Sequence, residues 1–190
     1  MAVPGDIPWS ATVSRGAANP RETQFALLFD EFSAPIYNYV LRMVGDPDRA
    51  ADITQDTFIK AYRKLDTLTD EASTKSWLYR IATNTAIDDM RRRRNVTTMS
   101  DDQPTFANRA DTRPGPEAQV MAGTLDERVQ RALMTLRPNH RQCLLLSDLD
   151  DMSAQQIGEV MGLSYGAVRT LLCRARGEMR RALAAEGFSR

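Results

Sequence analysis

Residues 153–184 read SAQQIGEVMGLSYGAVRTLLCRARGEMRRALA, and this stretch decides the fold. Ser153 and Gln156 form a capping box, in which a hydroxyl and an amide satisfy backbone groups at the start of a helix. Gly162 suits the left-handed residue that ends this helix, and Ser164 can cap the next one. Apolar residues then recur at helical spacing over nearly five turns. The pattern predicts a helix-turn-helix.

The second helix of this motif, from Tyr165 to about Ala184, carries a polar face. The side chains opposite its apolar stripe are Arg169, Thr170, Cys173 and Arg174. The N-terminal half of such a helix fits the DNA major groove, where arginine offers two donors to guanine or to phosphate. The alternative is a helix face whose arginines are only hydrated, but the capped helix and the glycine turn before it favour DNA reading. The later arginines of this helix are weaker candidates, for backbone contacts only.

Upstream of the motif, apolar residues again recur at helical spacing, and no stretch shows sustained strand-type alternation. Predicted helices cover about 25–43, 46–65, 74–94, 116–136 and 138–146. The chain is therefore predicted to be all-α, with two small helical domains joined by a flexible linker. The predicted boundaries are 1–22 for a loose N-terminal extension, 23–94 for the first domain, 95–115 for the linker and 116–190 for the second domain.

Composition narrows the class of protein. The 190 residues carry 25 Lys and Arg against 25 Asp and Glu, so the net charge is zero. This disfavours a protein that coats nucleic acid without sequence preference. No apolar stretch approaches the roughly 20 residues that a membrane-spanning helix needs, and the first ten residues lack a secretion signal. We expect a cytoplasmic protein with no membrane insertion of its own. Two cysteines exclude a disulfide framework, and we expect no cofactor.

Candidate catalytic and metal-binding residues are few. His140 and Cys143 lie three residues apart on one predicted helix, but two further ligands are missing, so a partly buried pair in the helical core is favoured. Asp52, Gln55 and Asp56 lie within two helical turns, without a nearby His or Cys to complete an acid-base site. We therefore predict no metal site and no enzyme activity.

The predicted helix over 74–94 combines aromatic side chains, an amide and a run of four arginines. Trp77 and Tyr79 could stack on single-stranded bases, since stacking contributes about 1–3 kcal/mol per base, while the cations follow the phosphates. Trp77 fits a helical core at least as well, and the arginines at 91–94 would also favour the negative end of the helix dipole. Spacing alone leaves both interpretations open.

Three segments of the chain share their order with a known family. They read ADITQDTF at 51–58, WLYRIATN at 77–84 and SYGAVRTLLCRAR at 164–176. Together they resemble the small extracytoplasmic-function (ECF) group of bacterial RNA polymerase sigma factors, in the sigma-70 family. The resemblance covers about residues 23–185, and three matches in this order are specific where one would be weak.

The resemblance implies a role for each domain. The first would bind the clamp helices of the polymerase β′ subunit and melt the −10 promoter element. The implied polymerase-binding residues are Asp52, Gln55, Asp56 and Phe58. The residues implied at −10 DNA are Arg80, Ile81, Asn84, Arg91, Arg92, Arg93 and Arg94, with Ile81 and Asn84 lining a pocket for a flipped base. The second domain would read the −35 element through Arg169, Thr170, Cys173 and Arg174.

The resemblance also implies partners. They are core RNA polymerase, including its β subunit, promoter DNA, and an anti-sigma factor that holds the protein inactive. Linker acids at Asp101, Asp102 and Asp111 would mimic nucleic acid inside the polymerase. The chain departs from the family pattern in Gln156-Ile157-Gly158, where the family usually has Glu before Ile-Ala, and in Cys173, which replaces a commonly larger residue.

Rival classes of function make different predictions. A free-standing helix-turn-helix regulator would bind duplex DNA tightly without polymerase. An enzyme acting on nucleic acid through Asp52 and Asp56 would need a metal ion and would lose turnover in Asp56→Ala. A pure adaptor would differ from a sigma factor only in failing to melt DNA.

Overall fold

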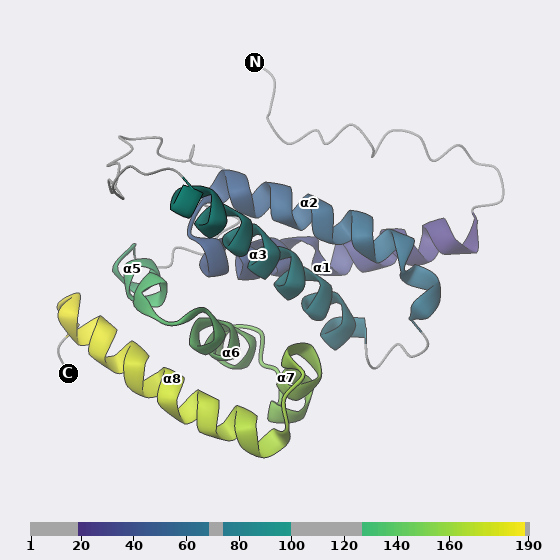
Figure 1. Ribbon diagram of the computed structural model, residues 1–190. Helices are drawn as coiled ribbons and strands as arrows, with labels where there is room; N and C mark the ends of the chain where they lie inside the picture. The colour runs from purple at the N-terminus through teal and green to yellow at the C-terminus, as the bar shows by residue number, and fades with distance from the viewer. Residues whose placement is uncertain (1–18, 69–73, 100–126, 189–190) are drawn as a thin grey trace.

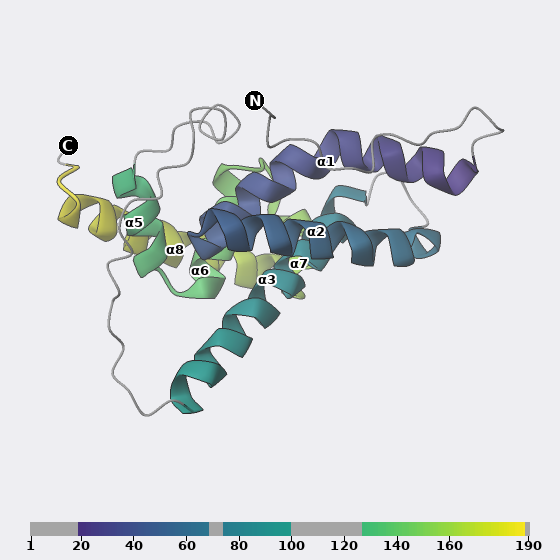
Figure 2. The same ribbon diagram turned by 90° about the horizontal axis from the view of Figure 1, so that it is seen from above.

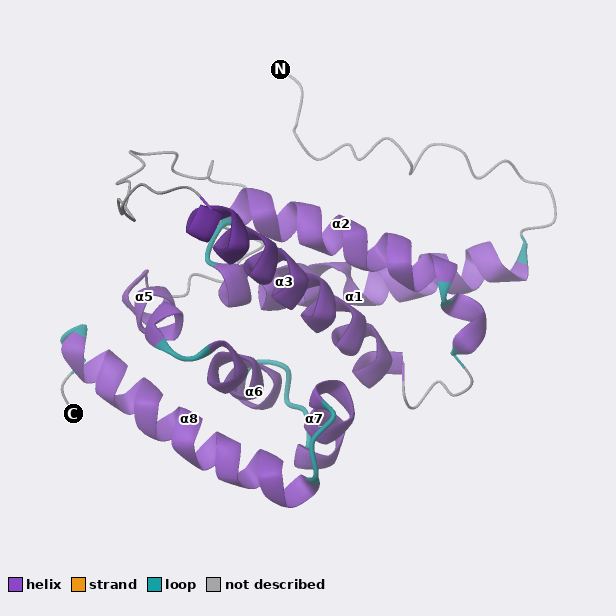
Figure 3. Ribbon diagram, viewed as in Figure 1, coloured by secondary structure: helices purple, strands orange, loops and turns teal. Residues whose placement is uncertain are grey.

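The computed structural model describes residues 19–68, 74–99 and 127–188 (Figure 1). Its helices are α1 (Pro20–Val44), α2 (Pro47–Arg63), α3 (Thr74–Met99), α5 (Glu127–Thr135), α6 (Pro138–Asp148), α7 (Ala154–Met161) and α8 (Tyr165–Ala185), with a short 3-10 helix, η1 (Leu65–Thr67). Figure 3 shows no strand in these ranges, which confirms the all-α prediction. None of the helices described is long and apolar enough to cross a membrane.

The helices α1, α2 and α3 pack into one bundle. Gly45 ends α1 in the left-handed conformation, with φ of 73°, and Asp46 caps α2 by accepting from the Arg49 amide at 3.1 Å. This tight turn makes α1 and α2 neighbours. The fully buried Tyr39 on α1 then forms a 2.8 Å hydrogen bond with Thr83 on α3. The bundle thereby fixes which faces of α2 and α3 stay exposed.

The C-terminal helices include the predicted helix-turn-helix. The Ser153 amide donates to Gln156 Oε1 at 2.9 Å, and the Gln156 amide donates to Ser153 Oγ at 3.3 Å, so the capping box is complete. Gly162 ends α7 with φ of 67°, and Ser164 caps α8 by accepting from the Ala167 amide. The motif predicted from sequence is confirmed, because its signals are local caps that act within one helical turn.

Two helix ends differ from the predicted domain boundaries. α1 begins at Pro20, inside the predicted extension, because Asn19 caps it and proline fits its first turn. α3 continues to Met99, inside the predicted linker, because no proline or glycine interrupts residues 91–99. Residues 1–18, the linker beyond Met99 with its three acids, and the helix start expected at Pro116 lie outside the described residues.

The two groups of helices pack against each other. α7 lies along α3, and α5 and α6 contact α1 (Figures 1 and 2). The Tyr79 hydroxyl on α3 donates to Asp150 Oδ1 at 2.5 Å, in the loop between α6 and α7, and Lys75 donates to the Asp150 backbone carbonyl. Gln130 on α5 donates to the Arg42 carbonyl on α1 at 3.4 Å. These polar contacts accompany an apolar one, because the buried apolar residues of both groups form a single cluster.

Arg141, on α6, joins both groups through backbone carbonyls. Its side chain is buried and donates to Leu133, Met134 and Leu136 at the end of α5, at 2.8, 2.9 and 3.1 Å. It also donates to Met43 at the end of α1, at 2.5 Å. Helix ends leave carbonyls unpaired and carry partial negative charge, so a cation suits both.

Replacing Arg141 with methionine should lower the free energy of unfolding by about 3 kcal/mol, because buried carbonyls left without donors cost about 1–3 kcal/mol each and the site relaxes only in part. Urea denaturation followed by circular dichroism measures the change. The matched control is Arg137→Met, at an exposed arginine just before the same helix. Equal stability of the two variants would contradict the role of Arg141.

Asp150 should make stability depend on pH. Burial raises the pKa of its carboxyl group to about 6, although the Tyr79 hydroxyl and the Lys75 ammonium oppose that rise. Between about pH 4 and pH 6 the folded chain then binds more protons at this group than the unfolded chain, so its contribution to stability falls as pH rises through that window. Urea midpoints should fall more steeply over this range for the natural chain than for Asp150→Asn. Urea midpoints that change equally with pH in both proteins would show that Asp150 does not cause the dependence.

Candidate nucleic-acid and polymerase interfaces

The N-terminal half of α8 presents its polar side chains to solvent. The predicted reading residues Arg169, Thr170, Cys173 and Arg174 are all exposed. Val168, one position before Arg169, is fully buried and anchors the opposite face of the helix. The structure thus brings the four residues predicted from the sequence onto one open surface.

Two of these side chains interact with their own helix. The Arg169 guanidinium lies 5.8 Å from the centre of the Tyr165 ring, which is 59% exposed. The Thr170 hydroxyl donates to the Gly166 carbonyl at 3.0 Å, so its oxygen can still accept from a base or a water. Tyr165 therefore joins the candidate surface. Its aromatic type and its place at the first turn were the signals for this in the sequence.

The direction of α8 depends on a close approach at Gly158, in α7. A Cβ atom at this position would lie 2.6 Å from the Leu163 carbonyl oxygen, and the Leu163 amide donates to the Gly158 carbonyl at 3.0 Å. Only glycine permits this approach without a shift of the backbone. The departure from the family pattern at Gly158 thus sets how the turn between α7 and α8 packs.

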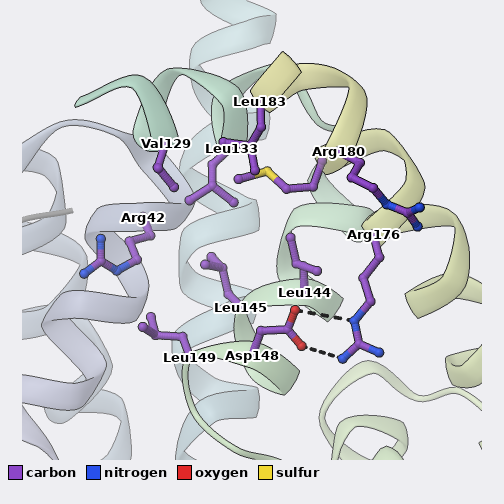
Figure 4. A pocket seen from close by; sticks show the side chains of 11 residues that line it. Arg42, Val129, Leu133, Leu144, Leu145, Asp148, Leu149, Arg176, Arg180 and Leu183 are labelled. Carbon is purple, nitrogen blue, oxygen red and sulfur yellow. Dashed lines mark hydrogen bonds and ion pairs between the residues drawn. The ribbon is translucent and has the colours of Figure 1, made fainter. Parts of the chain in front are cut away.

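Farther along α8, Arg176 contacts the protein itself. Its guanidinium donates to the two carboxylate oxygens of Asp148, at 2.6 and 3.4 Å, and to the Ser147 hydroxyl at 3.2 Å (Figure 4). The pair borders an apolar pocket of about 270 Å³ between α5, α6 and α8. Arg176 therefore ties α8 to α6 and is a weaker candidate for DNA contact than Arg174.

His140 and Cys143, which were considered for metal or thiol chemistry, are buried in the helical core. His140 is buried, and its Nδ1 lies 2.7 Å from Glu178 Oε2 on α8. Burial raises the pKa of the Cys143 thiol to about 11, which keeps it protonated near neutral pH. Across the described ranges, no three His, Cys, Asp or Glu side chains gather where a metal ion could bind.

One face of α3 stays open to solvent. Arg80 and Asn84, one helical turn apart, are exposed on it. Trp77 is 9% exposed and Tyr79 is fully buried, so both are core residues and their interpretation as base-stacking platforms is wrong for this structure. Ile81 is also only 9% exposed, because it packs in the same core. The open part of the predicted flipped-base pocket is therefore Asn84.

The basic end of α3 projects from the body of the molecule (Figure 2). The side chains of Arg91–Arg93 are exposed, whereas that of Arg94 lies outside the described residues. Asp89 on the same helix accepts from Arg49 of α2 at 2.6 and 3.1 Å, and two of the basic side chains lie 3.7 and 3.8 Å from it. The Asp89 carboxylate offsets part of the positive charge of the arginines at 91–93 and orients two of their side chains.

α2 carries an acidic and amide face. Asp52, Gln55 and Asp56 are exposed on successive turns, and Ile59 follows on the same face with 43% of its surface exposed. Ile59 adds one apolar contact point to this polar face. Ile59 was not among the residues predicted from the sequence, although its spacing of three and seven residues from Asp56 and Asp52 indicated it.

Phe58 is a correction to the predicted polymerase-binding set. It is 4% exposed and packs edge-on against Phe29 at 4.8 Å and Phe25 at 6.3 Å, measured between ring centres. The ring fills the space between α1 and α2, so it supports the α2 face from beneath. It is closed to a partner in this structure.

Two family profiles match the chain in order. Sigma-70 region 2 matches residues 28–96, and Sigma-70, region 4 matches residues 126–179. These ranges contain all the candidate residues on α2, α3 and α8. The matched regions thus coincide with the two groups of helices.

Similar proteins cover most of the chain. The ECF RNA polymerase sigma factor SigW of Bacillus subtilis is 29% identical over 84% of this chain and 88% of its own. RNA polymerase sigma factor YlaC of the same organism is 30% identical over 81% of this chain and 88% of its own. The sigma factor RpoE from Bartonella quintana, solved in complex with the anti-sigma factor NepR, shares the fold with a TM-score of 0.72 at 23% identity, over 85% of this chain and 98% of that one.

Gly158→Ala should destabilise the C-terminal helices by about 1–3 kcal/mol, because the new Cβ would overlap a backbone carbonyl that cannot swing aside. Gly177→Ala is the matched control, since nothing lies within 4 Å of a Cβ there, and it should stabilise α8 by about 0.5–1 kcal/mol. Scanning calorimetry would show opposite shifts in Tm. Upward shifts in both variants would disprove the close approach.

Proposed function

The chain belongs to the ECF group of the sigma-70 family of RNA polymerase sigma factors, and we propose that it directs the polymerase to promoters by reading a −35 element with α8 and a −10 element with α3. The observation that carries the proposal is the order of the two matched regions, each with an exposed polar helix face. The protein is a transcription initiation factor. We propose further that it has no catalysis of its own and acts in the cytoplasm.

At the −35 element, α8 enters the major groove. Arg169 and Arg174 donate to guanine edges or phosphates, and Thr170 and Cys173 contact the bases between them. Stacking of the Arg169 guanidinium near Tyr165 limits its motion, so less side-chain entropy is lost on binding. Ser164 contributes indirectly, because its cap fixes the first turn of the reading helix.

At the −10 element, α3 holds the melted strand. Asn84 forms hydrogen bonds with a flipped base, with Ile81 as the apolar wall behind it, and Arg80 and the arginines at 91–94 follow the phosphates. A flipped base exchanges its stacking in the duplex for contacts in a protein pocket, and this lowers the cost of melting. The first domain thus supplies strand separation in addition to recognition.

The polymerase binds the α2 face. Asp52, Gln55 and Asp56 offer acceptors around the apolar Ile59, and this pattern fits a basic and partly apolar helical partner such as the β′ clamp. The buried Phe58 keeps this face rigid through its contacts with α1.

The two domains must separate to read both elements. By their labels, the −35 and −10 positions lie roughly 25 base pairs apart, which is about 85 Å along the DNA at 3.4 Å per base pair. A compact chain of 190 residues has a radius of gyration of about 16 Å, so the closed arrangement cannot span that distance. Residues 100–126 are long enough, since a segment of that length reaches about 90 Å when extended.

We propose that an anti-sigma factor holds the closed arrangement. The structure of RpoE, which has a similar fold, contains the anti-sigma factor NepR bound to it. Because an inhibitor that binds only the closed form lowers the population of the open form, it would suppress promoter binding without covering either DNA-reading face.

In vitro transcription tests the function. The protein, added to bacterial core RNA polymerase, should form a stable complex and start transcription at sites that share two elements at fixed spacing. Arg174→Ala should lose recognition of the upstream element, because one bidentate contact contributes about 1–3 kcal/mol of discrimination. Asn84→Ala should still bind the promoter but melt it poorly, as measured by permanganate reactivity of thymines.

The control is Arg180→Ala, an exposed arginine on α8 beyond the reading face, which should transcribe like the natural chain. Tight binding of duplex DNA without any polymerase complex would favour a free-standing regulator instead. Promoter binding with polymerase but no melting would favour an adaptor.

A further inference from the structure

Met134, near the end of α5, is the most exposed methionine among those whose side chains the structure describes. It is 41% exposed, whereas Met43 and Met152 are buried and Met161 at the end of α7 is half-buried. Oxidation of methionine by an oxidant in solution follows the exposure of the residue. Met134 is therefore the described methionine that such an oxidant reaches most readily.

The sulfur of Met134 contacts the arginine that joins the two groups of helices. Arg141 Nη1 donates to Met134 Sδ at 3.1 Å and to the Met43 carbonyl at 2.5 Å. Arg141 Nη2 donates to the Met134 carbonyl at 2.9 Å. A thioether is a weak acceptor, but here it accepts from a cation that is buried. A chemical change at this sulfur therefore acts directly on the guanidinium of Arg141.

The same thioether packs on the turn between α1 and α2. A Cβ atom at Gly45 would lie 3.0 Å from Met134 Sδ and 3.2 Å from its Cε, so the side chain lies directly on the glycine. Gly45 ends α1 in the left-handed conformation, and this helix end fixes the position of its backbone. Contacts this close leave no space for a further atom between Met134 and the turn. The sulfur thus lies at a joint of α1, α5 and α6.

Oxidation to the sulfoxide would reverse the electrostatics of the contact with Arg141. The new oxygen carries partial negative charge and leaves the sulfur partly positive, and a positive sulfur that faces Arg141 Nη1 repels it. The side chain could instead turn its oxygen toward Nη1, but a hydrogen bond to that oxygen alone needs about 2.9 Å. The 3.1 Å between Nη1 and Sδ does not hold an additional atom. In both cases Met134 must leave its place on Gly45.

We propose that Met134 is a site of reversible oxidation by hydrogen peroxide, and that its sulfoxide loosens the contact of α5 with α1 and α6. A lone pair of Sδ attacks one peroxide oxygen, and the S–O bond forms as the O–O bond breaks. The leaving hydroxide takes the proton of the transferred oxygen and departs as water, so the thioether loses two electrons and the peroxide gains them. A methionine sulfoxide reductase reverses the step with electrons from a thiol. The inference is independent of the proposed function, because it concerns only how the helices are held.

The effect should be confined to the joint. Besides the contacts of Met134, α5 is tied to the end of α1 by Gln130, which donates to the Arg42 carbonyl at 3.4 Å. A hydrogen bond of this length is weak, so the position of α5 against α1 depends in part on Met134. The contacts of α2 with α3 do not involve α5. Oxidation should therefore increase local opening in α5 and leave α2 and α3 protected.

Treatment of the full chain with hydrogen peroxide, followed by peptide mass spectrometry, tests the modification. Dithiothreitol added afterwards returns cysteine sulfenic acids and disulfides to thiols, so the oxygen that remains on a methionine peptide reports the sulfoxide. Met134 should be oxidised about fivefold faster than the half-buried Met161. Hydrogen–deuterium exchange of the oxidised chain should be faster at the amides of α5 and unchanged in α2 and α3. Incubation with methionine sulfoxide reductase should restore the original rates.

Met134→Leu conserves the volume of the side chain and removes the sulfur, so its exchange rates should not change with peroxide. Met161→Leu is the matched control and should respond to peroxide like the natural chain. Oxidation of Met134 no faster than that of Met161 would overturn the proposal. Unchanged exchange in α5 after Met134 is oxidised would do the same, as would exchange that rises with peroxide in Met134→Leu or rises equally in α2 and α3.

Discussion

A buried arginine, with no carboxylate partner among the described residues, holds the two groups of helices together. Arg141 places its charge against the carbonyl ends of α5 and α1, where helices have unpaired acceptors. A neutral side chain there would leave those acceptors buried and unpaired, and a lysine could not reach so many of them from one position. Because one of the helices belongs to each domain, the same side chain completes the second domain and docks it on the first.

The docking leaves the candidate faces exposed on different helices of a chain with zero net charge. The acidic and amide face of α2 and the basic faces of α3 and α8 stay exposed, while the aromatic side chains of α3 are used in the core. Charge is therefore separated by helix face rather than by domain. Total charge did not reveal this, since opposite patches cancel in the sum.

Local signals in the sequence predicted the helices and the motif, but not the contacts between domains. The capping box of Ser153 and Gln156 acts within four residues, so the sequence alone was enough to predict it. Arg141 and Met43 are 98 residues apart, and Arg141 looks in the sequence like any helix arginine. The resemblance placed Phe58 in the polymerase-binding set, although an apolar side chain fits a helical core equally well. Only its packing against Phe25 and Phe29 shows that it is a core residue.

The domain contact combines an apolar cluster shared by both groups with hydrogen bonds between them. Its hydrogen bonds, such as those from Tyr79 to Asp150 and from Gln130 to the Arg42 carbonyl, can be exchanged for bonds to water when the domains part, so each contributes little net free energy. Buried side-chain atoms of Asn38, Arg42 and Asp150, which have no hydrogen-bond partner among the described residues, weaken closure further, because opening lets water reach them. Polymerase and DNA on one side, or an inhibitor on the other, then shift the population of the closed form by the difference in their affinities for the two forms.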